Sequence, residues 1–493
     1  MSSARAQPAD RSAGRTFRAR RSAASRLIYR LRWPLGGVLL LAVSALLVGA
    51  AEVRPGYDHY GWLVWGHLTL HGKLDTNGAP SWKPLPYLFT LPYALAGRDA
   101  LYLWMTTAFA VSLSGMVFAW RVAFWLVGAP AQRRYAAYAA GLVAALAVAG
   151  ISRYPHSVLS AESDTMIVAL CLAAVDCMLC RRYRWAFWLW WLAALGRPEA
   201  WVLLGLYLLW AWRQVPAMRW QMVAGVALVP LLWFGIPALT SKSLFSPATL
   251  AENSPRALHG NKITGTFGRF LALNAPTIKI TALAAVILAA LRRDRRVLAL
   301  AAGVVVWVAV EILFALHGWS AVPRYIYEAG AGLGVLAGVF VGLVILDAPH
   351  VLEWMRVRVS PQLAGLASLI VLAGFALSLA STARSRVVYE REDLSEQRTR
   401  ASEIKLLDRV VDHLGAARIL ACGHPNIRIG WQSALAWDLG TNVGVLFYNP
   451  NSQRTHPQPV VNMYARSYGW SFFPSHTRTA AQTARCSGLT YRT

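Results

Sequence analysis

An aspartate lies shortly after the first apolar run of the chain. The run covers residues 34–51, and Asp58 lies in the polar segment 54–60 behind it. A carboxylate at such a boundary, next to a long polar loop, can act as a general base that takes a proton from an attacking hydroxyl. A solvated aspartate near a helix end would leave the same pattern, so both interpretations stay open.

Three cations outside the arginine-rich clusters are candidates for contacts with phosphate. Lys83 stands before a proline-rich segment, Arg197 interrupts an apolar stretch, and Arg324 follows a proline at the start of another. Ammonium and guanidinium groups both suit phosphate oxygens. The alternatives are a snorkelling lysine at Lys83, a structural ion pair between Arg197 and Glu199, and an interfacial anchor at Arg324.

Aromatic and acidic residues near these positions form a second group of candidates. Tyr57, Tyr60 and Trp82 either stack on sugar faces or belong to the aromatic belt of a membrane interface. Glu162 and Asp164 fall on the same predicted side of the membrane as the aspartate described above. They either line the same cavity as Asp58 or, as a simpler alternative, the next helix is merely capped at its start by Ser163 or Asp164.

No motif indicates a cofactor. The 11 histidines are scattered, and there is neither a His-Glu-x-x-His motif nor a pair of Cys-x-x-Cys motifs. A Ser-His-Asp pattern and a glycine-rich phosphate loop are also absent from the sequence. We therefore predict no metal site, although a divalent metal remains compatible with the sequence. The same absences exclude a cytoplasmic nucleotide-sugar or ATP site and favour a lipid-linked donor.

The composition places these residues in a membrane protein. Of the 493 residues, 56% are hydrophobic and only 15% are charged, whereas about a quarter of the residues of a soluble domain are charged. The net charge of +26 comes from arginines in the gaps between apolar runs, which is typical of cytoplasmic loops under the positive-inside rule. The lipid bilayer is therefore the predicted partner, and nucleic acid is excluded.

Hydropathy predicts about eleven membrane helices, including two in residues 185–212. The Gly-Arg-Pro-Glu sequence at 196–199 splits that stretch, and the split places the later arginine clusters on the cytoplasmic side. A cleaved signal peptide at 34–51 would leave the following segment on the same outer side. The helices are predicted at 34–51 and near 100–127, 136–152, 164–180, 185–212 (two), 221–238, 276–291, 297–316, 325–346 and 363–381.

This arrangement divides the chain into three parts. They are a basic cytoplasmic tail (1–33), a transmembrane domain (34–381) with external loops 54–99 and 239–275, and an extracytoplasmic domain (382–493). An amphipathic helix near 404–414 and β-like runs at 418–421 and 443–448 predict a small α/β fold for the last part. Cys422 and Cys486 form a disulfide if this part lies outside, or else remain two buried thiols.

The polar segment 54–100 resembles the first external loop of the GT-C-fold glycosyltransferases, specifically the protein-mannosyltransferase and aminoarabinose-transferase-like group. In that family an acidic residue follows the first transmembrane helix. A "Tyr … Gly-x-Leu-x-x-Gly" stretch and a Lys-Pro-Pro-Leu-like motif come next. Asp58, residues 66–74 and the Lys-Pro-Leu-Pro of residues 83–86 stand in these places here. The acidic pair of the family is reduced to one aspartate, which leaves metal use open.

Two shorter motifs extend the resemblance. The Arg-Pro dipeptide at 197–198 and the Pro-Arg-Tyr sequence at 323–325 are similar to sequences that the family has at corresponding helix ends. The resemblance covers about residues 34–345 in architecture, whereas 382–493 matches no family that we can name.

The resemblance implies a polytopic α-helical, GT-C-like fold and an inverting glycosyltransferase in the cell membrane. Its donor would be a sugar on a polyprenyl phosphate, and its acceptor an envelope glycan, lipid or protein outside the cytoplasm. Asp58 would be the catalytic base, and Lys83, Arg197 and Arg324 would hold the carrier phosphate.

Two other classes of protein remain open. A flippase or transporter for lipid-linked sugars would explain Arg197 and Glu199 inside the membrane without any chemistry. A non-catalytic membrane protein that organises envelope enzymes would need no donor site at all. The identities of the sugar and of the acceptor stay open as well.

Overall fold

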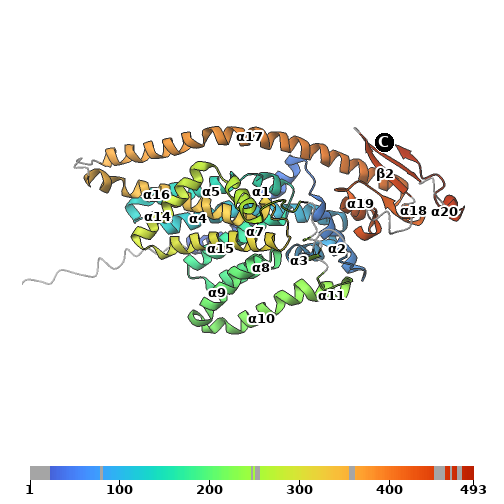
Figure 1. Ribbon diagram of the computed structural model, residues 1–493, viewed down its shortest axis with the longest axis horizontal. Helices are drawn as coiled ribbons and strands as arrows, with labels where there is room; N and C mark the ends of the chain where they lie inside the picture. The colour runs from blue at the N-terminus through green and yellow to red at the C-terminus, as the bar shows by residue number, and fades with distance from the viewer. Residues whose placement is uncertain are drawn as a thin grey trace, which may run out of the picture.

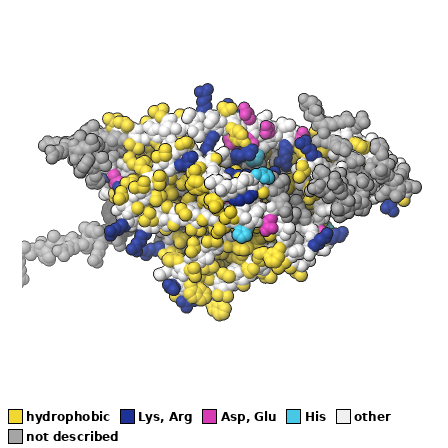
Figure 2. Space-filling model, in the orientation of Figure 1, with side chains coloured by type: hydrophobic (Ala, Val, Ile, Leu, Met, Phe, Trp, Pro, Cys, Tyr) yellow, Lys and Arg dark blue, Asp and Glu magenta, His cyan; other side chains and the backbone are white. Residues whose placement is uncertain are grey.

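The computed structural model is mostly helical, with a small sheet at one end (Figure 1). It describes residues 23–77, 82–245, 248–249, 252, 256–354, 361–448, 461–466, 469–474 and 480–492. Hydrophobic side chains cover much of the helical part in Figure 2, and Lys and Arg lie mostly at its margins. This is the surface expected of a protein whose helices face lipid.

Helix α16 (Tyr327–Trp354) lies at the centre of the bundle. It packs along α5 (Arg134–Ala149) and α14 (Pro276–Arg292) and also contacts α4 (Ala100–Val127). Gly338 faces α5 so closely that an added Cβ would lie 2.3 Å from the carbonyl oxygen of Ala140. Small residues at such a seam let two helices approach closely, as is typical of membrane helix pairs.

Six helices in the described residues are long and apolar enough to cross a membrane, or seven if one bent pair counts as a span. The six are Leu31–Ala51, Pro84–Val127, Pro216–Thr240, Arg295–Leu316, Pro323–Asp347 and Leu369–Leu414, and the bent pair is Lys262–Leu273 with Pro276–Arg292. The other predicted spans exist as helices of 14 to 17 residues, shorter than the roughly 20 residues of a straight span. The chain thus has the helices of a multi-pass membrane protein, and the count of eleven stays a prediction.

The predicted split at the Arg-Pro dipeptide is confirmed. Helix α8 (Tyr183–Gly196) ends there, and α9 (Ala200–Gln214) begins after it. A continued helix would bond the carbonyl of Ala194 to the nitrogen of residue 198, which is a proline without an N–H. The indole nitrogens of Trp201 and Trp233 donate to that carbonyl instead, at 2.8 and 2.9 Å. The freed backbone group is therefore satisfied inside the protein.

Helix α17 (Pro361–Leu414) joins the bundle to the C-terminal region as one helix of 54 residues (Figure 1). It contains both the predicted last span and the predicted amphipathic helix, so the expected boundary at residue 382 falls inside a helix. Val410 and Val411 of α17 share a second apolar core with Val64 and Leu68 of α2 (Tyr57–Leu70). This core fixes the C-terminal region against the bundle.

A four-stranded sheet follows α17, with strand order β1-β2-β3-β4. Strand β1 pairs in parallel with β2, and the pairs β2–β3 and β3–β4 are antiparallel. The strands are Pro425–Asn426 (β1), Val461–Arg466 (β2), Gly469–Pro474 (β3) and Tyr491–Arg492 (β4).

Both β-like runs predicted for this region were wrong. Residues 418–421 belong to helix α18 (Ala416–Cys422), and Val443–Val445 form a 3-10 helix in which the side chain of Asn442 accepts from the N–H of Gly444. Phe447 makes only an isolated bridge to β1. Apolar runs of four to six residues fit a strand or a buried helix equally well, so periodicity could not decide between them.

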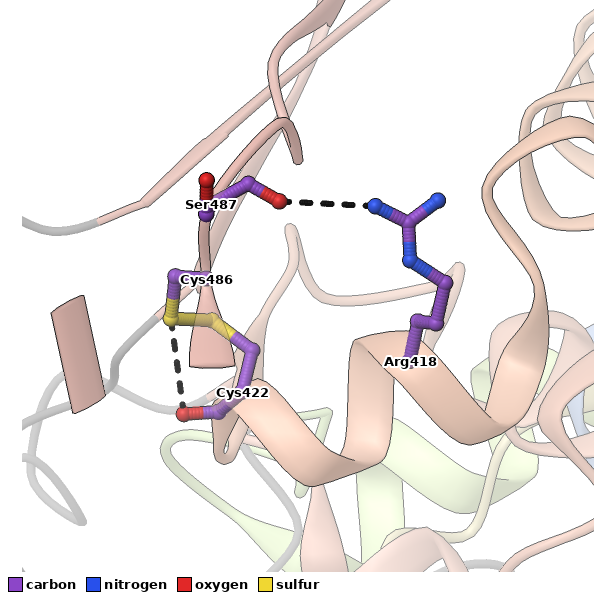
Figure 3. Close-up of a disulfide and its surroundings, with 4 residues drawn as sticks. All are labelled: Arg418, Cys422, Cys486 and Ser487. Carbon is purple, nitrogen blue, oxygen red and sulfur yellow. Dashed lines mark hydrogen bonds between the residues drawn. A yellow bond between two sulfur atoms is a disulfide. The ribbon is translucent and has the colours of Figure 1, made fainter. Parts of the chain in front are cut away.

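Cys422 and Cys486 form a disulfide, with their Cα atoms 4.9 Å apart. The bond joins the end of α18 to the segment before β4, and Arg418 donates to the carbonyl of Ser487 beside it at 3.4 Å (Figure 3). The disulfide interpretation is therefore confirmed over that of two free thiols.

Removal of this disulfide is expected to loosen the C-terminal region. The two cysteines are 64 residues apart, and closing a loop of that length contributes about 4 kcal/mol in the chain-entropy model. A Cys422→Ala, Cys486→Ala variant should therefore lose its C-terminal region to protease at a lower temperature than wild type. Cys180→Ala, which removes a free thiol, serves as the control. Maleimide labelling of all five cysteines in unfolded, unreduced protein would contradict the bond.

Candidate active site

A cavity of about 600 Å³ lies at the end of the bundle that carries the C-terminal region. Residues from the start of α2, the segment before α3 (Pro84–Tyr93), the α8–α9 break and the turn before α16 line it. The C-terminal region closes another side. Segments more than 250 residues apart in the sequence therefore meet around one space.

Asp58 lies in the first turn of α2 and lines this cavity, as does Tyr57. The helix is held at its start by the N–H of Gly56, which donates to the carbonyl of Ser160 at 3.3 Å. Tyr60 does not line the cavity, because it is buried in the main core. Of the three aromatic residues predicted to stack on sugar, Tyr57 and Trp82 thus face the cavity.

Lys83, Arg197 and Arg324 all line the same cavity as Asp58. Lys83 immediately precedes α3, Arg197 follows the last residue of α8, and Arg324 lies in the 3-10 helix Pro323–Ile326 before α16. Each cation thus stands at or near the end of a helix. The structure brings together the predicted base and the three predicted phosphate contacts.

Three carboxylates lie behind these cations and do not line the cavity. Glu162 Oε1 is 2.7 Å from Arg324 Nη1, and Asp164 Oδ1 is 3.7 Å from Lys83 Nζ. Asp164 also pairs with Arg197, whose Nη1 is 3.4 Å from Glu199 Oε1. The predicted Arg197–Glu199 pair therefore forms, but as one contact of a larger network.

The network directs positive charge toward the cavity. Arg324 contacts Glu162 behind it and Asp58 beside it, with Nη2 3.4 Å from Asp58 Oδ2. The guanidinium of Arg197 lies over the ring of Tyr325, with its Cζ 3.6 Å from the ring centroid. Fixed partners on one side leave the cation faces on the other side available to an anion.

Burial and neighbouring charge shift the pKa values of this network. Burial, and then the positive charge of Arg197, lower the pKa of Lys83 to about 8. Burial acts to raise the pKa of Glu162, but Arg324 and His59 outweigh it and lower that pKa to about 2. Near neutral pH, Glu162 is thus an anion, and Lys83 is a cation close to its titration range.

Much of the remaining lining of the cavity is apolar and aromatic. Its side chains come from α9, the segment around residues 233–245 and the end of α15 (Arg295–Leu316). They are Trp201, Trp233, Phe234, Leu244, Phe245 and Phe314. A ligand with a charged head and an apolar tail matches a cavity that has both cationic and apolar lining residues.

Several functional candidates were missed by the sequence predictions. Tyr325 orients Arg197, while Gln432 and Tyr448 reach the cavity from the C-terminal region. Tyr325 stands next to a predicted site residue, so its position was a usable signal. Gln432 and Tyr448 carry no motif, and only the folded chain brings them to the site.

The fold and this cavity define a multi-pass helical membrane protein with a charged site at one end of its bundle. Two crystal structures of ArnT from Cupriavidus metallidurans are similar to it. The apo structure covers 91% of this chain and 98% of that chain, at 15% identity and a TM-score of 0.48. The structure bound to undecaprenyl phosphate covers 89% of this chain and 97% of that chain, at 14% identity and a TM-score of 0.47.

No protein-family model and no curated protein sequence match the chain.

Proposed function

We propose that this protein is an inverting glycosyltransferase that moves a sugar from a polyprenyl-phosphate donor to an acceptor outside the cytoplasm. One observation carries the proposal: Asp58 lies beside the three predicted cations in one cavity, which Arg256 also lines, while the carboxylate partners of those three lie behind them. The charged side suits a phosphate, and the aromatic side suits the first isoprene units of its lipid.

In this reaction the oxygen of an acceptor hydroxyl attacks the anomeric carbon of the donor sugar. The bond from that carbon to the phosphate oxygen breaks, and the phosphate leaves with the electron pair. Lys83, Arg197 and Arg324 stabilise the negative charge of the leaving phosphate. The hydroxyl proton passes to Asp58, which Arg324 holds in place at 3.4 Å. In-line attack inverts the anomeric configuration, and a phosphate leaving group needs no general acid.

Chain geometry supports an extracytoplasmic site. Helix α15 has 22 residues, so it separates the arginine-rich turn 292–296 from the turn that carries Arg324 by about 33 Å. The arginine cluster at one end fits the cytoplasmic side, and the cavity then falls outside. The disulfide in the C-terminal region fits an oxidising compartment on that same side.

We propose a reaction in which a metal is optional. Among the described residues, no group of three or more His, Cys, Asp or Glu side chains could hold a metal ion. Transfer measured with EDTA and with added Mg²⁺ or Mn²⁺ tests this part. A complete loss of transfer in EDTA, restored by a metal, would overturn it.

The proposal is tested by transfer from labelled donors. Membranes that contain the protein would be given polyprenyl-phosphate mannose, polyprenyl-phosphate arabinofuranose and related donors. Incorporation of label with release of polyprenyl phosphate supports a transferase. Movement of intact donor across liposomes that contain the pure protein, without release of polyprenyl phosphate, would instead support the transporter class.

The donor step is expected to weaken at alkaline pH. The pKa of Lys83 is lowered to about 8, so the free protein loses this cation as pH rises through that value. The pH dependence of kcat/KM for the donor reports the pKa values of ionising groups in the free enzyme. We therefore expect kcat/KM to fall above pH about 8. Lys83→Arg should remove that decline, because arginine keeps its charge.

Lys73→Arg is the matched control for this pH profile, because Lys73 is exposed and does not line the cavity. Its profile should follow that of wild type. If Lys83→Arg declines at the same pH as wild type, the titrating group is not Lys83.

A further inference from the structure

The C-terminal region forms one wall of the cavity. Its lining residues are Ile429, Gly430, Gln432 and Tyr448. They offer an amide, a phenol ring and an aliphatic side chain, and none of the four is charged. This wall thus differs in chemistry from the cationic side formed by the bundle.

Gln432 is held so that its amide NH₂ group remains available. The side chain is buried, at 2% exposure, and its Oε1 accepts from the N–H of Gly430 at 2.6 Å. Its Nε2 makes no hydrogen bond to any residue in the described part of the chain. Because the carbonyl end is occupied and the residue lines the cavity, Nε2 is the group that Gln432 offers to a ligand.

The loop that carries Gln432 is fixed on its outer side. Gly430 has a φ of +99°, which favours glycine, and its carbonyl accepts from Arg400 of α17 at 3.4 Å. Trp431 packs edge-to-face on Trp470 of β3, with ring centroids 5.3 Å apart. The wall is therefore a formed part of the fold.

Helix α2 fixes the position of this wall relative to Asp58. It carries Asp58 at its start, and it packs against the C-terminal region that forms the wall. Asp58 lies in the first turn of α2, and α19 (Gln432–Leu439) packs along the rest of that helix. Asn442, just beyond α19, donates to the carbonyl of Asp75 at 2.8 Å. Asp58 and the amide of Gln432 therefore line the same cavity, and the elements that carry them, α2 and α19, are packed together.

We infer that this wall is the acceptor subsite, and that it takes a neutral carbohydrate whose hydroxyl is presented to Asp58. Neutral hydrogen-bonding groups beside an aromatic ring are what a sugar binds through, with its hydroxyls on the amide and a face on the ring. A phosphorylated or acidic acceptor would find no countercharge among the four residues of this wall. The inference rests on the proposed function, because it assigns the second substrate of the same reaction.

The test uses the purified full chain in nanodiscs, with two neutral glycosides and undecaprenyl phosphate as separate probes. Octyl mannoside and octyl arabinofuranoside stand for the acceptor, and binding is followed through tryptophan fluorescence. Gln432→Ala should raise the Kd of a bound glycoside by about 5- to 10-fold, the effect of one neutral hydrogen bond. The Kd of undecaprenyl phosphate should change less than 2-fold. Gln214→Ala, at the far end of α9 and exposed, should change neither.

Gln432→Glu separates ligand binding from a purely structural role. A glutamate keeps the oxygen that accepts from Gly430 and loses the amide donor, so a glycoside oxygen that accepts from Nε2 would face a carboxylate oxygen instead. Weak glycoside binding by Gln432→Glu supports the subsite. Binding equal to that of wild type would overturn it, because the residue would then only hold the loop.

The two proposals fail in different ways. If undecaprenyl phosphate binds and Lys83→Ala weakens it, but neither glycoside binds to wild type, the acceptor subsite is wrong and the donor site stands. If undecaprenyl phosphate does not bind, or binds equally well to Lys83→Ala, the proposed function itself is wrong.

Discussion

Replacing Asp58 by asparagine is expected to lower sugar transfer by about 10²- to 10⁴-fold, the usual contribution of a general base. The amide has nearly the shape of the carboxylate but cannot accept the hydroxyl proton. Arg324 should keep its position, because it also contacts Glu162 at 2.7 Å and Asp164 at 3.5 Å. Donor affinity should therefore stay close to that of wild type. The measurement is the rate of label transfer at saturating donor, together with the Kd for undecaprenyl phosphate.

Asp99→Asn provides the matched control for this measurement. Asp99 is exposed at the start of α4 and makes no side-chain capping bond, so its loss should leave transfer unchanged. Full transfer by Asp58→Asn would remove Asp58 from the mechanism. Loss of transfer together with loss of lipid binding would show that Asp58 acts in the donor site and not as the base.

The helices were predictable because long apolar runs follow from the membrane itself. The span predicted near 100–127 matches α4 (Ala100–Val127), and the split after Gly196 followed from a proline beside two charges. The strands of the C-terminal sheet could not be predicted in this way. Strands β1 and β4 have two residues each, which leaves no periodicity to detect.

Asp58 and the three cations could be predicted from the sequence, but most of the ion pairs that hold the cations could not. The three cations stand out because each lies next to a proline at the end of an apolar run, and Asp58 stands out because it follows the first apolar run within a few residues. Their carboxylate partners do not stand out, since Arg324 and Glu162 are 162 residues apart in the sequence. Simple capping of the next helix by Ser163 or Asp164 was therefore the easier interpretation of the segment that contains Glu162 and Asp164. The structure gives both of them ion pairs instead, and α7 (Ser163–Leu179) starts without a side-chain capping bond.

These carboxylates explain how several cations can be held together without a ligand. Like charges repel strongly when they are buried together, so Lys83, Arg197 and Arg324 need nearby anions to remain grouped. Placing those anions away from the cavity preserves the attraction for phosphate at the cavity surface. If the proposed function is right, the arrangement serves both folding and donor binding, and removal of one cation should damage both.

Arg197→Met is expected to have the largest effect on stability. The side chains of Arg197, Asp164 and Glu199 are 4%, 3% and 0% exposed, so the variant leaves two buried carboxylates without their main partner. Removing one partner of a buried ion pair typically destabilises a protein by about 3–5 kcal/mol. The 3.7 Å contact between Lys83 and Asp164 offsets part of this loss. The midpoint of thermal unfolding in detergent should fall well below that of Arg213→Met, an exposed position near the end of α9.

A compensated variant distinguishes the structural role of Arg197 from its proposed role in donor binding. Adding Asp164→Asn and Glu199→Gln to Arg197→Met replaces the stranded charges by neutral amides of similar size, so much of the lost stability should return. Affinity for undecaprenyl phosphate should not return with it, because a cation that faces the cavity is still missing. If lipid affinity recovers together with stability, Arg197 supports the fold alone. If neither recovers, the amides leave buried polar groups unpaired, and Arg197→Lys then tests whether a positive charge is sufficient to restore binding.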